Sequence, residues 1–342
     1  MKPEHSYQTE ILNLKKTKPS MAFDPQKENF DEWKLKAKAK LYELLGLEKY
    51  KKTDDLFTIE YSHEHRAYTK IRFTFQSEEG CIVPCCLAVP KEKICEKPPV
   101  MICLQGHGTG MHISFGIAKY EIDEPKIKNG DRDFAKQCIK KGICALSVEQ
   151  RCFGERGGNP RPDCRAAALT ALLTGRTLIG GRVWDIMRVI DILEKHFDDV
   201  CNTERIYCMG NSGGGTATFY ASALEDRIKA VIPSCAFCTF LKSIGELNHC
   251  ACNYIPHIAE YFDMAEIAGM SAPKPMVVVS GVEDGIFPIK AAESEFDRLK
   301  KIYAAAGAPE NCIHAKGKEG HRFYAQEGWT AFESIVKLSD KQ

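Results

Sequence analysis

Short apolar runs alternate with helical patterns from residue 99 onward, and this alternation strongly constrains the fold. Strands that are apolar throughout are buried on both faces, which is typical of parallel sheets. Helices between such strands supply the crossovers that a parallel sheet requires. The pattern therefore predicts an α/β fold with a mainly parallel sheet of about eight strands flanked by helices. The apolar runs are Val100–Leu104, Ile143–Val148, Ile206–Met209, Ala230–Pro233 and Met276–Ser280, with a last strand expected at Cys312–Ala315. The helical patterns are Asp131–Lys141, Val183–His196, Thr216–Leu224 and Ala291–Ala306.

The residues before position 99 show a helical pattern followed by three β-type runs. Apolar side chains recur at three- and four-residue steps from Phe30 to Leu45, which predicts a helix that ends near Gly46. Three β-type runs follow, separated by short turn signals, and favour an antiparallel start to the sheet. We predict an N-terminal helical extension over residues 1–55 and an α/β domain over residues 56–342. The three β-type runs are Phe57–Tyr61, Thr69–Gln76 and Ile82–Val89.

Composition argues against several classes of protein. The 342-residue chain has a net charge of +1, so it has no bulk attraction for nucleic acid or for an anionic membrane. No apolar run approaches the ~18 residues of a membrane span, and the N-terminal residues lack the pattern of a secretory signal. Many of the 16 cysteines lie inside apolar runs, as small hydrophobic residues do in a reducing compartment. We expect a cytoplasmic protein with free thiols; homo-oligomerisation is left open.

One serine lies in the glycine-rich segment Gly210–Gly215, between an apolar run and a helical pattern. A Gly-x-Ser-x-Gly pattern in a strand–turn–helix setting places a nucleophilic serine, here Ser212, on a sharp and strained turn. The glycines are required because side chains would not fit beside so tight a turn. The helix that follows directs its N-terminal N–H groups toward the reaction centre. A phosphate-binding loop is disfavoured because no lysine follows the glycines.

A serine nucleophile needs an acid and a base, which follow it along the chain in this order in sites of this type. The acid is predicted to be Asp284, at the end of an apolar run; its neighbour Glu283 is the alternative. Two histidines lie beyond the acid. His314 falls inside the last predicted strand, whereas His321 lies in a glycine-flanked loop, so His321 is the predicted base.

Two N–H donors are also needed to stabilise the oxyanion of a tetrahedral intermediate. Gly213, directly after the serine, is predicted to supply one, and His107, in a glycine-rich loop after an early strand, to supply the other. The glycine spacing of the His107 loop does not match a dinucleotide-binding fingerprint. We therefore expect no organic cofactor.

Besides the Gly-Asn-Ser-Gly-Gly-Gly turn, five stretches form motifs: Gln105–Gly108, Val148–Arg156, Gly181–Asp185, His249–Pro256 and Glu319–Phe323. Together they resemble α/β-hydrolases of the acetyl xylan esterase and dienelactone hydrolase-like group. The resemblance covers roughly residues 80–335 and implies the α/β-hydrolase fold and serine hydrolase chemistry. The better-known deacetylases of the group carry Gly-x-Ser-Gln-Gly, whereas Gly213 follows the serine here.

The predicted function is hydrolysis of a small-acyl carboxylic ester, for which an acetylated carbohydrate is one candidate. Ser212 would attack the carbonyl carbon, His321 would transfer the proton, and Asp284 would orient the imidazole. A peptidase or amidase could use the same residues, but oligopeptidases of this fold usually carry a β-propeller for which 342 residues leave no room. A dienelactone-type lactone hydrolase is closer, although that group often uses a cysteine nucleophile. A non-catalytic ligand-binding relative is the last alternative.

The segment at residues 235–270 interrupts the alternation and is predicted to form a lid or cap over the carboxyl ends of the strands. Its cysteines Cys250 and Cys252, with Cys235, Cys238 and the adjacent His249, could supply zinc ligands, but their spacings do not match the usual paired motifs. We therefore expect no metal. The substrate-binding residues are not predicted; candidates for an aromatic pocket lining are Phe153, Phe237, Phe240, Tyr254 and Trp184.

Overall fold

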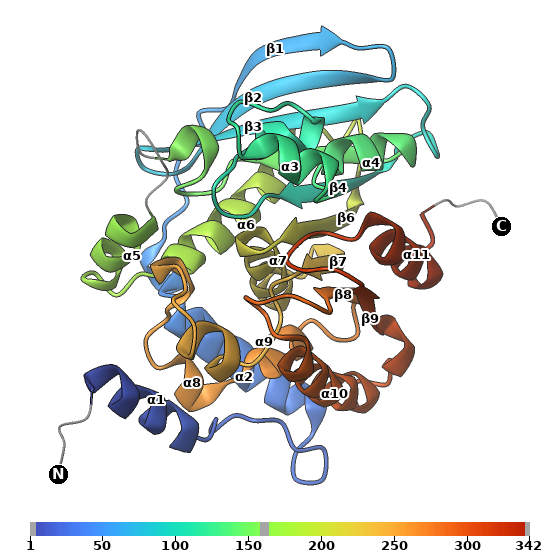
Figure 1. Cartoon of the computed structure of the whole chain (residues 1–342). Helices are drawn as coiled ribbons and strands as arrows, with labels where there is room; N and C mark the ends of the chain where they lie inside the picture. Colours follow the sequence, from blue (N-terminus) through green and yellow to red (C-terminus); the bar gives the residue numbers. More distant parts are fainter. Residues whose placement is uncertain (1–4, 158–163, 339–342) are drawn as a thin grey trace.

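A nine-stranded sheet forms the centre of the computed structural model, which describes residues 5–157 and 164–338 (Figure 1). The strands are β1 (Thr58–Glu64), β2 (Tyr68–Glu78), β3 (Cys81–Pro90), β4 (Pro99–Leu104), β5 (Cys144–Val148), β6 (Asn202–Asn211), β7 (Ile228–Ser234), β8 (Met276–Gly281) and β9 (Cys312–Gly317). Their order in the sheet is β1-β2-β3-β5-β4-β6-β7-β8-β9. The pairs from β1 to β5 are antiparallel, and those from β5 to β9 are parallel. The predicted mainly parallel sheet with an antiparallel start is confirmed.

Helices cover both faces of this sheet. They are α1 (Ser6–Lys16), α2 (Phe30–Leu44), α3 (Asp123–Lys128), α4 (Phe134–Lys140), α5 (Cys164–Leu172), α6 (Leu178–His196), α7 (Gly213–Leu224), α8 (Ile258–Tyr261), α9 (Met264–Gly269), α10 (Ile289–Ala305) and α11 (Ala325–Ile335). One buried cluster joins the sheet to α2, α6, α7, α9 and α10, and a second joins its other face to α4 and α11. In β4, Ile102 points into the first cluster and Cys103 into the second, as the two-residue period of a strand requires.

Two helices begin three or more residues earlier than their sequence patterns predict, and α10 begins two residues earlier, at Ile289 rather than Ala291. α6 begins at Leu178 rather than Val183, because the hydroxyl of Thr177 accepts a hydrogen bond from the Gly180 N–H at 3.0 Å. α7 begins at Gly213 rather than Thr216, directly after the serine. Glycine has low helix propensity, so the sequence pattern alone places both starts too late. None of the helices within residues 5–157 and 164–338 is long and apolar enough to cross a membrane.

The apolar side of α2 packs onto the core of the sheet. Its residues Trp33, Ala37 and Leu41 are buried and belong to the same cluster as the strand residue Ile102. The Trp33 indole also donates a hydrogen bond to the Met21 carbonyl at 2.9 Å, which ties the chain before the helix to the helix itself. The N-terminal residues thus share their core with the residues that follow. A domain boundary near residue 55 stays a prediction.

The segment at residues 235–270 has two parts, and both contribute side chains to the first cluster. The second part, residues 262–270, contains α9 and is buried almost throughout. The carboxylate of Asp263 joins the two parts, because it accepts the Phe240 N–H at 2.8 Å and forms a capping box with Glu266 at the start of α9. The first part contains only short helical turns, and α1 lies beside it, where the Tyr7 hydroxyl donates to the Gly245 carbonyl at 2.8 Å (Figure 1). A lid function for the segment stays a prediction.

Candidate active site

Ser212 lies at the turn between β6 and α7. Its backbone angles are φ 56° and ψ −125°, a strained conformation for any residue other than glycine. Two hydrogen bonds hold this turn: the Ser212 N–H donates to the Ser234 carbonyl at 2.8 Å, and the Thr216 N–H donates to the Ser212 carbonyl at 2.8 Å. A Cβ on Gly210 would lie 2.4 Å from the backbone of Gly214, so this turn excludes a side chain there. The turn therefore holds Ser212, half-buried, at the carboxyl end of β6.

His321 and Asp284 come together beyond the ends of β9 and β8. The Nδ1 atom of His321 lies 2.8 Å from Asp284 Oδ2, and Asp284 Oδ1 accepts the backbone N–H groups of Ile286 at 2.8 Å and Phe287 at 3.0 Å. Burial opposes the charge of Asp284, but the hydrogen bond from His321 and the two backbone donors outweigh it and hold the pKa of Asp284 below its ordinary value. Asp284 is therefore an anion that fixes the orientation of the His321 ring. The Phe287 ring stacks on the imidazole at a centroid distance of 5.9 Å.

The two alternatives weighed in the sequence lie elsewhere. Glu283 is exposed, and its N–H donates to the Glu319 carbonyl at 3.0 Å. The His314 Nε2 atom lies 2.9 Å from the Ser280 hydroxyl, on the strand pair β8–β9. The structure thus brings the predicted acid and base into contact. Within the described residues it shows no hydrogen bond between Ser212 and His321, a contact that tightens in many enzymes only when substrate binds.

The loop after β4 packs against the serine turn. A Cβ on Gly213 would lie 2.8 Å from two ring atoms of His107, so the imidazole and the Gly213 backbone are in direct contact. The ammonium group of Lys126 donates to the carbonyls of His107 at 3.1 Å and Gly108 at 3.0 Å. These contacts fix the loop beside the turn. The two residues predicted to stabilise an oxyanion, His107 and Gly213, are therefore neighbours.

A buried cation lies next to this turn. Arg132 is 5% exposed; its Nε atom donates to Gln105 Oε1 at 3.2 Å, and its Nη2 atom has no hydrogen-bond partner among the described residues. A Cβ placed on Gly106 would lie 2.8 Å from Arg132 Nη2 and 2.9 Å from Ser212 Cβ, so the guanidinium and the serine are separated only by Gly106. Burial lowers the pKa of Arg132 to about 10, which leaves it charged at neutral pH. Sequence patterns gave no signal for this residue.

A cavity of about 700 Å³ opens beside His107. Its lining includes His107, Phe153, Leu169, His249 and Tyr254. Two of the five aromatic residues considered from the sequence, Phe153 and Tyr254, therefore face this cavity. The other three, Phe237, Phe240 and Trp184, belong to the main core.

His249 brings an unpaired donor to this cavity. The Asn253 amide donates to His249 Nδ1 at 2.9 Å and to the Cys250 carbonyl at 3.4 Å, which fixes the amide and leaves the proton of the neutral imidazole on Nε2. The Nε2 atom is buried and has no partner among the described residues. Burial, and then the neighbouring His107, lower the pKa of His249 to about 4, so the ring is neutral near pH 7. The sequence marked His249 only as a neighbour of two cysteines.

Buried ion pairs position the stretch that carries Phe153. Asp185 on α6 accepts bonds from Arg151 at 2.8 Å and Arg156 at 2.7 Å, on either side of Phe153. Burial opposes the charge of Asp185, but the two guanidinium groups hold the pKa of its carboxyl well below the usual range. The Phe153 ring also lies 4.8 Å from the His107 ring, between ring centroids. These contacts connect the motif at residues 148–156 to the His107 loop.

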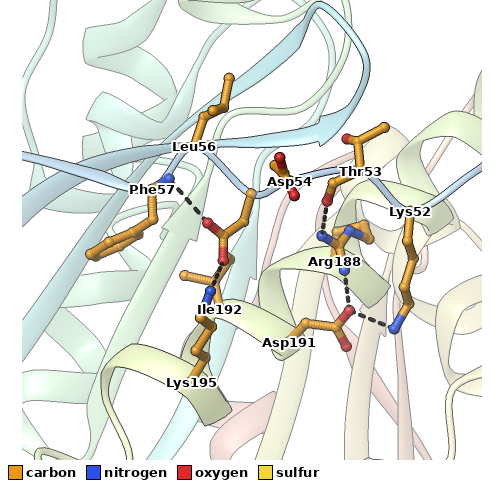
Figure 2. Close-up of a pocket in the computed structure, with 10 residues that line it drawn as sticks. Lys52, Thr53, Asp54, Leu56, Phe57, Arg188, Asp191, Ile192 and Lys195 are labelled. Carbon is orange, nitrogen blue, oxygen red and sulfur yellow. Dashed lines mark hydrogen bonds and ion pairs between the residues drawn. The ribbon is translucent and has the colours of Figure 1, made fainter.

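A second cavity, of about 600 Å³, lies where the chain before β1 passes α6 (Figure 2). Five of the six charged side chains that line it pair with one another: Asp191 accepts bonds from Lys52 and Arg188, and Lys195 pairs with Asp55 (Figure 2). These five charges are therefore satisfied within the protein. We assign no chemical role to this cavity.

Two families match the sequence in adjacent halves of the chain. The prolyl oligopeptidase family matches residues 176–337, which contain Ser212, Asp284 and His321, and the Abhydrolase family matches residues 6–167, which contain His107. A relative in Bacillus subtilis, YtaP, which is assigned as a hydrolase, is 26% identical over 235 residues. These residues are 68% of this chain and 76% of YtaP.

Solved structures share the fold at lower identity. A Bacteroides fragilis protein assigned as an acetyl xylan esterase is 17% identical with a TM-score of 0.77, over 99% of this chain and 91% of that one. A glucuronoyl esterase from Solibacter usitatus is 15% identical with a TM-score of 0.63, over 89% and 91% of the two chains. Acetyl xylan esterase 1 from Thermoanaerobacterium is 14% identical with a TM-score of 0.60, over 96% and 98%.

These likenesses confirm the fold that the sequence motifs imply. The strained serine turn follows a strand of a mainly parallel sheet, and the family that matches this half of the chain is one of hydrolases. The second family and the Bacillus subtilis relative point to the same class. The chain is therefore an α/β-hydrolase of the serine hydrolase class.

Proposed function

We propose that the protein is a carboxylesterase that removes a small acyl group, with acetyl as the first candidate, from a carbohydrate ester. The observation that carries this proposal is the 2.8 Å contact between His321 Nδ1 and Asp284 Oδ2 at the same edge of the sheet as the strained serine turn. An imidazole held through Nδ1 leaves Nε2 to exchange a proton with a serine hydroxyl. The solved structures that share the fold include acetyl xylan esterases and glucuronoyl esterases, which supports an ester of a carbohydrate.

The reaction would proceed through an acyl-enzyme. Ser212 Oγ attacks the ester carbonyl carbon while His321 Nε2 takes the hydroxyl proton, and Asp284 stabilises the imidazolium that forms. The tetrahedral intermediate collapses when His321 returns the proton to the departing alcohol oxygen. Water then attacks the acyl-serine, again giving a proton to His321, and the second collapse releases the carboxylic acid and restores Ser212.

Two features would stabilise the negative charge of the tetrahedral intermediate. The first is the pair of N–H groups of His107 and Gly213, because the loop and the turn that carry them are in contact. Losing one donor of this kind typically costs ~3–4 kcal/mol of transition-state stabilisation. The second is the positive charge of Arg132, one glycine away from Ser212 and shielded from solvent. A charge in such a low-dielectric site acts more strongly than the same charge in water.

The cavity beside His107 suits a sugar alcohol as leaving group. It offers the aromatic rings of Phe153 and Tyr254, which can pack on the apolar faces of a sugar ring, and the Nε2–H of His249, which can donate to a sugar hydroxyl. Its volume of about 700 Å³ is within the range of small-molecule sites.

A peptidase is the second candidate, because the family that matches residues 176–337 is that of prolyl oligopeptidases. The described residues of this chain form a single nine-stranded sheet with its helices. A peptidase with the same serine, acid and base would cleave amides as well as activated esters. Comparing matched acetyl esters and acetyl amides separates the two functions.

The test is the initial rate of hydrolysis of p-nitrophenyl esters from acetate to octanoate, followed by acetylated xylo-oligosaccharides and the matched p-nitroanilides. We expect acetate to be the best aryl ester, and acetate release from the sugar. Ser212→Ala should abolish turnover and labelling by a fluorophosphonate. Ser222→Ala is the matched control, because Ser222 is a buried serine on α7 whose hydroxyl bonds to none of the residues that the structure describes. Amide cleavage without sugar deacetylation would favour the peptidase, and a folded protein inactive on every substrate would overturn the esterase.

A further inference from the structure

Three cysteines and a histidine that are far apart in the sequence meet beside the cavity. His107 comes from the loop after β4, Cys164 begins α5, and Cys250 and Cys252 lie in the segment between β7 and α8, beside α5 (Figure 1). One ligand atom from each residue lies within 4.8 Å of the others. His107 Nε2 is 3.0 Å from Cys252 Sγ, and the three cysteines are not joined in disulfides.

A buried guanidinium contacts the sulfur atoms. Arg182 on α6 is 1% exposed, and its Nη1 and Nη2 atoms lie 3.4 Å from Cys252 Sγ and 3.3 Å from Cys164 Sγ. Its other contacts are the Arg151 carbonyl at 3.1 Å and the face of the Phe153 ring. Among the described residues no carboxylate pairs with it. Burying an uncompensated cation is unfavourable, and thiolates at Cys164 and Cys252 would supply the counter-charge to Arg182.

We propose that His107, Cys164, Cys250 and Cys252 bind one zinc ion. Three thiolates and one imidazole form a ligand set that is typical of structural zinc sites. Zn²⁺ with three thiolates carries one net negative charge, which the Arg182 guanidinium balances. The sulfur-rich set disfavours magnesium and calcium, which prefer oxygen ligands.

The surroundings give this ion a route in and a structural role. Cys164 and Cys252 are buried, whereas His107 and Cys250 are half-buried and line the cavity, through which the ion can enter. Four protein ligands complete the tetrahedron and leave no position for a reacting water. The zinc would therefore join the His107 loop, α5 and residues 250–252 into one rigid wall of the cavity. This set differs from the one considered in the sequence: Cys235 groups instead with Asp284 and His321, and Cys238 contacts the Pro288 carbonyl.

The first test is the metal content of the full-length protein, purified without chelators from cells supplied with zinc. We expect about one zinc per chain in the wild type and a loss of at least about tenfold in Cys164→Ala and Cys252→Ala. Cys312→Ala is the matched control, because Cys312 is a buried cysteine on β9, outside the cluster, and should keep the zinc. Wild-type protein without zinc, or cluster variants with an undiminished content, would overturn the proposal.

A second measurement uses the wild type and the control alone, in case the cluster variants do not fold. Zinc is removed with a chelator and Co²⁺ is added. We expect the near-ultraviolet thiolate-to-cobalt band and the intense visible bands of tetrahedral cobalt, at one equivalent, in both proteins. Octahedral cobalt spectra would contradict the proposal. So would a peptide map that finds Cys164 joined by a disulfide to Cys250 or Cys252 in protein prepared under reducing conditions, because the cluster would then be a redox pair.

Discussion

The His107 imidazole packs so closely on Gly213 that a Cβ on Gly213 would lie 2.8 Å from the ring atoms Cε1 and Nδ1. The ring cannot easily retreat, because Cys252 lies 3.0 Å from its Nε2 atom and Phe153 borders it. An added methyl group would therefore displace the His107 loop from the serine turn.

We predict that Gly213→Ala lowers kcat/KM on p-nitrophenyl acetate by about 10²-fold, since small displacements of oxyanion donors have effects of that size. The protein should stay folded, with a loss of stability of about 1–3 kcal/mol. Gly285→Ala is the control, because a Cβ there meets no atom within 4 Å. Kinetics and urea unfolding of both variants test this. Full activity in Gly213→Ala would mean that the His107 loop does not take part in the reaction.

The acid is tested by an isosteric change. Asp284→Asn removes the negative charge that orients His321 and should lower kcat by about 10³–10⁴-fold, because the wrong imidazole tautomer is then favoured. Glu283→Gln changes the neighbouring exposed acid and should leave kcat within about twofold. If Glu283→Gln proved the more damaging change, the acid would have been assigned to the wrong residue.

Arg132 should affect activity and stability in opposite directions. Arg132→Met removes a positive charge close to Ser212 and should lower kcat by about tenfold or more. It also removes a buried cation that pairs with no carboxylate among the described residues, so the free energy of unfolding should stay constant or rise by about 1 kcal/mol. Arg298→Met is the contrasting control: Arg298, on α10, pairs with Glu266 and Glu295, so its loss should destabilise the fold and spare kcat. A parallel fall of both quantities in Arg132→Met would make Arg132 a purely structural residue.

His249 should distinguish substrates by their alcohol. His249→Phe keeps the ring against Phe287 but removes the unpaired Nε2–H donor. We expect KM for an acetylated xylo-oligosaccharide to rise about tenfold, the effect of one hydrogen bond, while kinetics on p-nitrophenyl acetate change little. Equal losses on both substrates would place the effect at the serine rather than in the cavity.

The stability of the protein should fall on acidification through a group outside the site. Burial, and then Lys316, lower the pKa of His314 to about 4, from an ordinary value of 6.5. Between these values the unfolded chain binds a proton that the folded chain does not, so unfolding becomes more favourable as pH falls from 6.5 toward 4. The contribution is fully present above pH 6.5.

Urea unfolding at pH 7 and pH 4.5 measures this contribution. His314→Gln keeps a hydrogen-bonding group beside Ser280 but cannot titrate in this range. From pH 7 to pH 4.5 the free energy of unfolding should fall in both proteins. The fall in His314→Gln should be smaller than the fall in the wild type by about 2 kcal/mol. Equal falls in the two proteins would show that His314 is protonated equally readily in the folded and unfolded states.

The sequence predicted most of what depends on local pattern. The apolar runs mark the strands because β4 and its neighbours are buried on both faces, and Ser212 is marked by glycines that only a tight turn requires. The contact between Asp284 and His321 could be anticipated because chain order and strand ends limit the choices. The predicted starts of α6 and α7 are too late, because both helices have glycines in their first turns. Glycine has low helix propensity, so the sequence pattern does not mark these turns as helical.

What the sequence could not predict are groupings created only by the fold. Cys164 is separated from Cys250 by nearly a quarter of the chain, and no spacing rule connects either to His107. Arg132 lies in a stretch that reads as an ordinary helix, and its unpaired Nη2 atom is a property of the packed interior. Such residues are found by asking which buried polar groups lack a partner.

Asp263 anchors both ends of the segment at residues 240–263. This has a consequence for how related proteins could come to act on different substrates. The carboxylate accepts the Phe240 N–H and caps the start of α9, and residues 248–251 and Tyr254 of that interval line the cavity. Replacements at the cavity-lining positions that are not zinc ligands, Asn248, His249, Ala251 and Tyr254, can therefore accumulate while β7, β8 and the serine turn stay in place. Selection for an ester with a different alcohol would then change these few cavity-lining positions, while the catalytic residues are inherited unchanged.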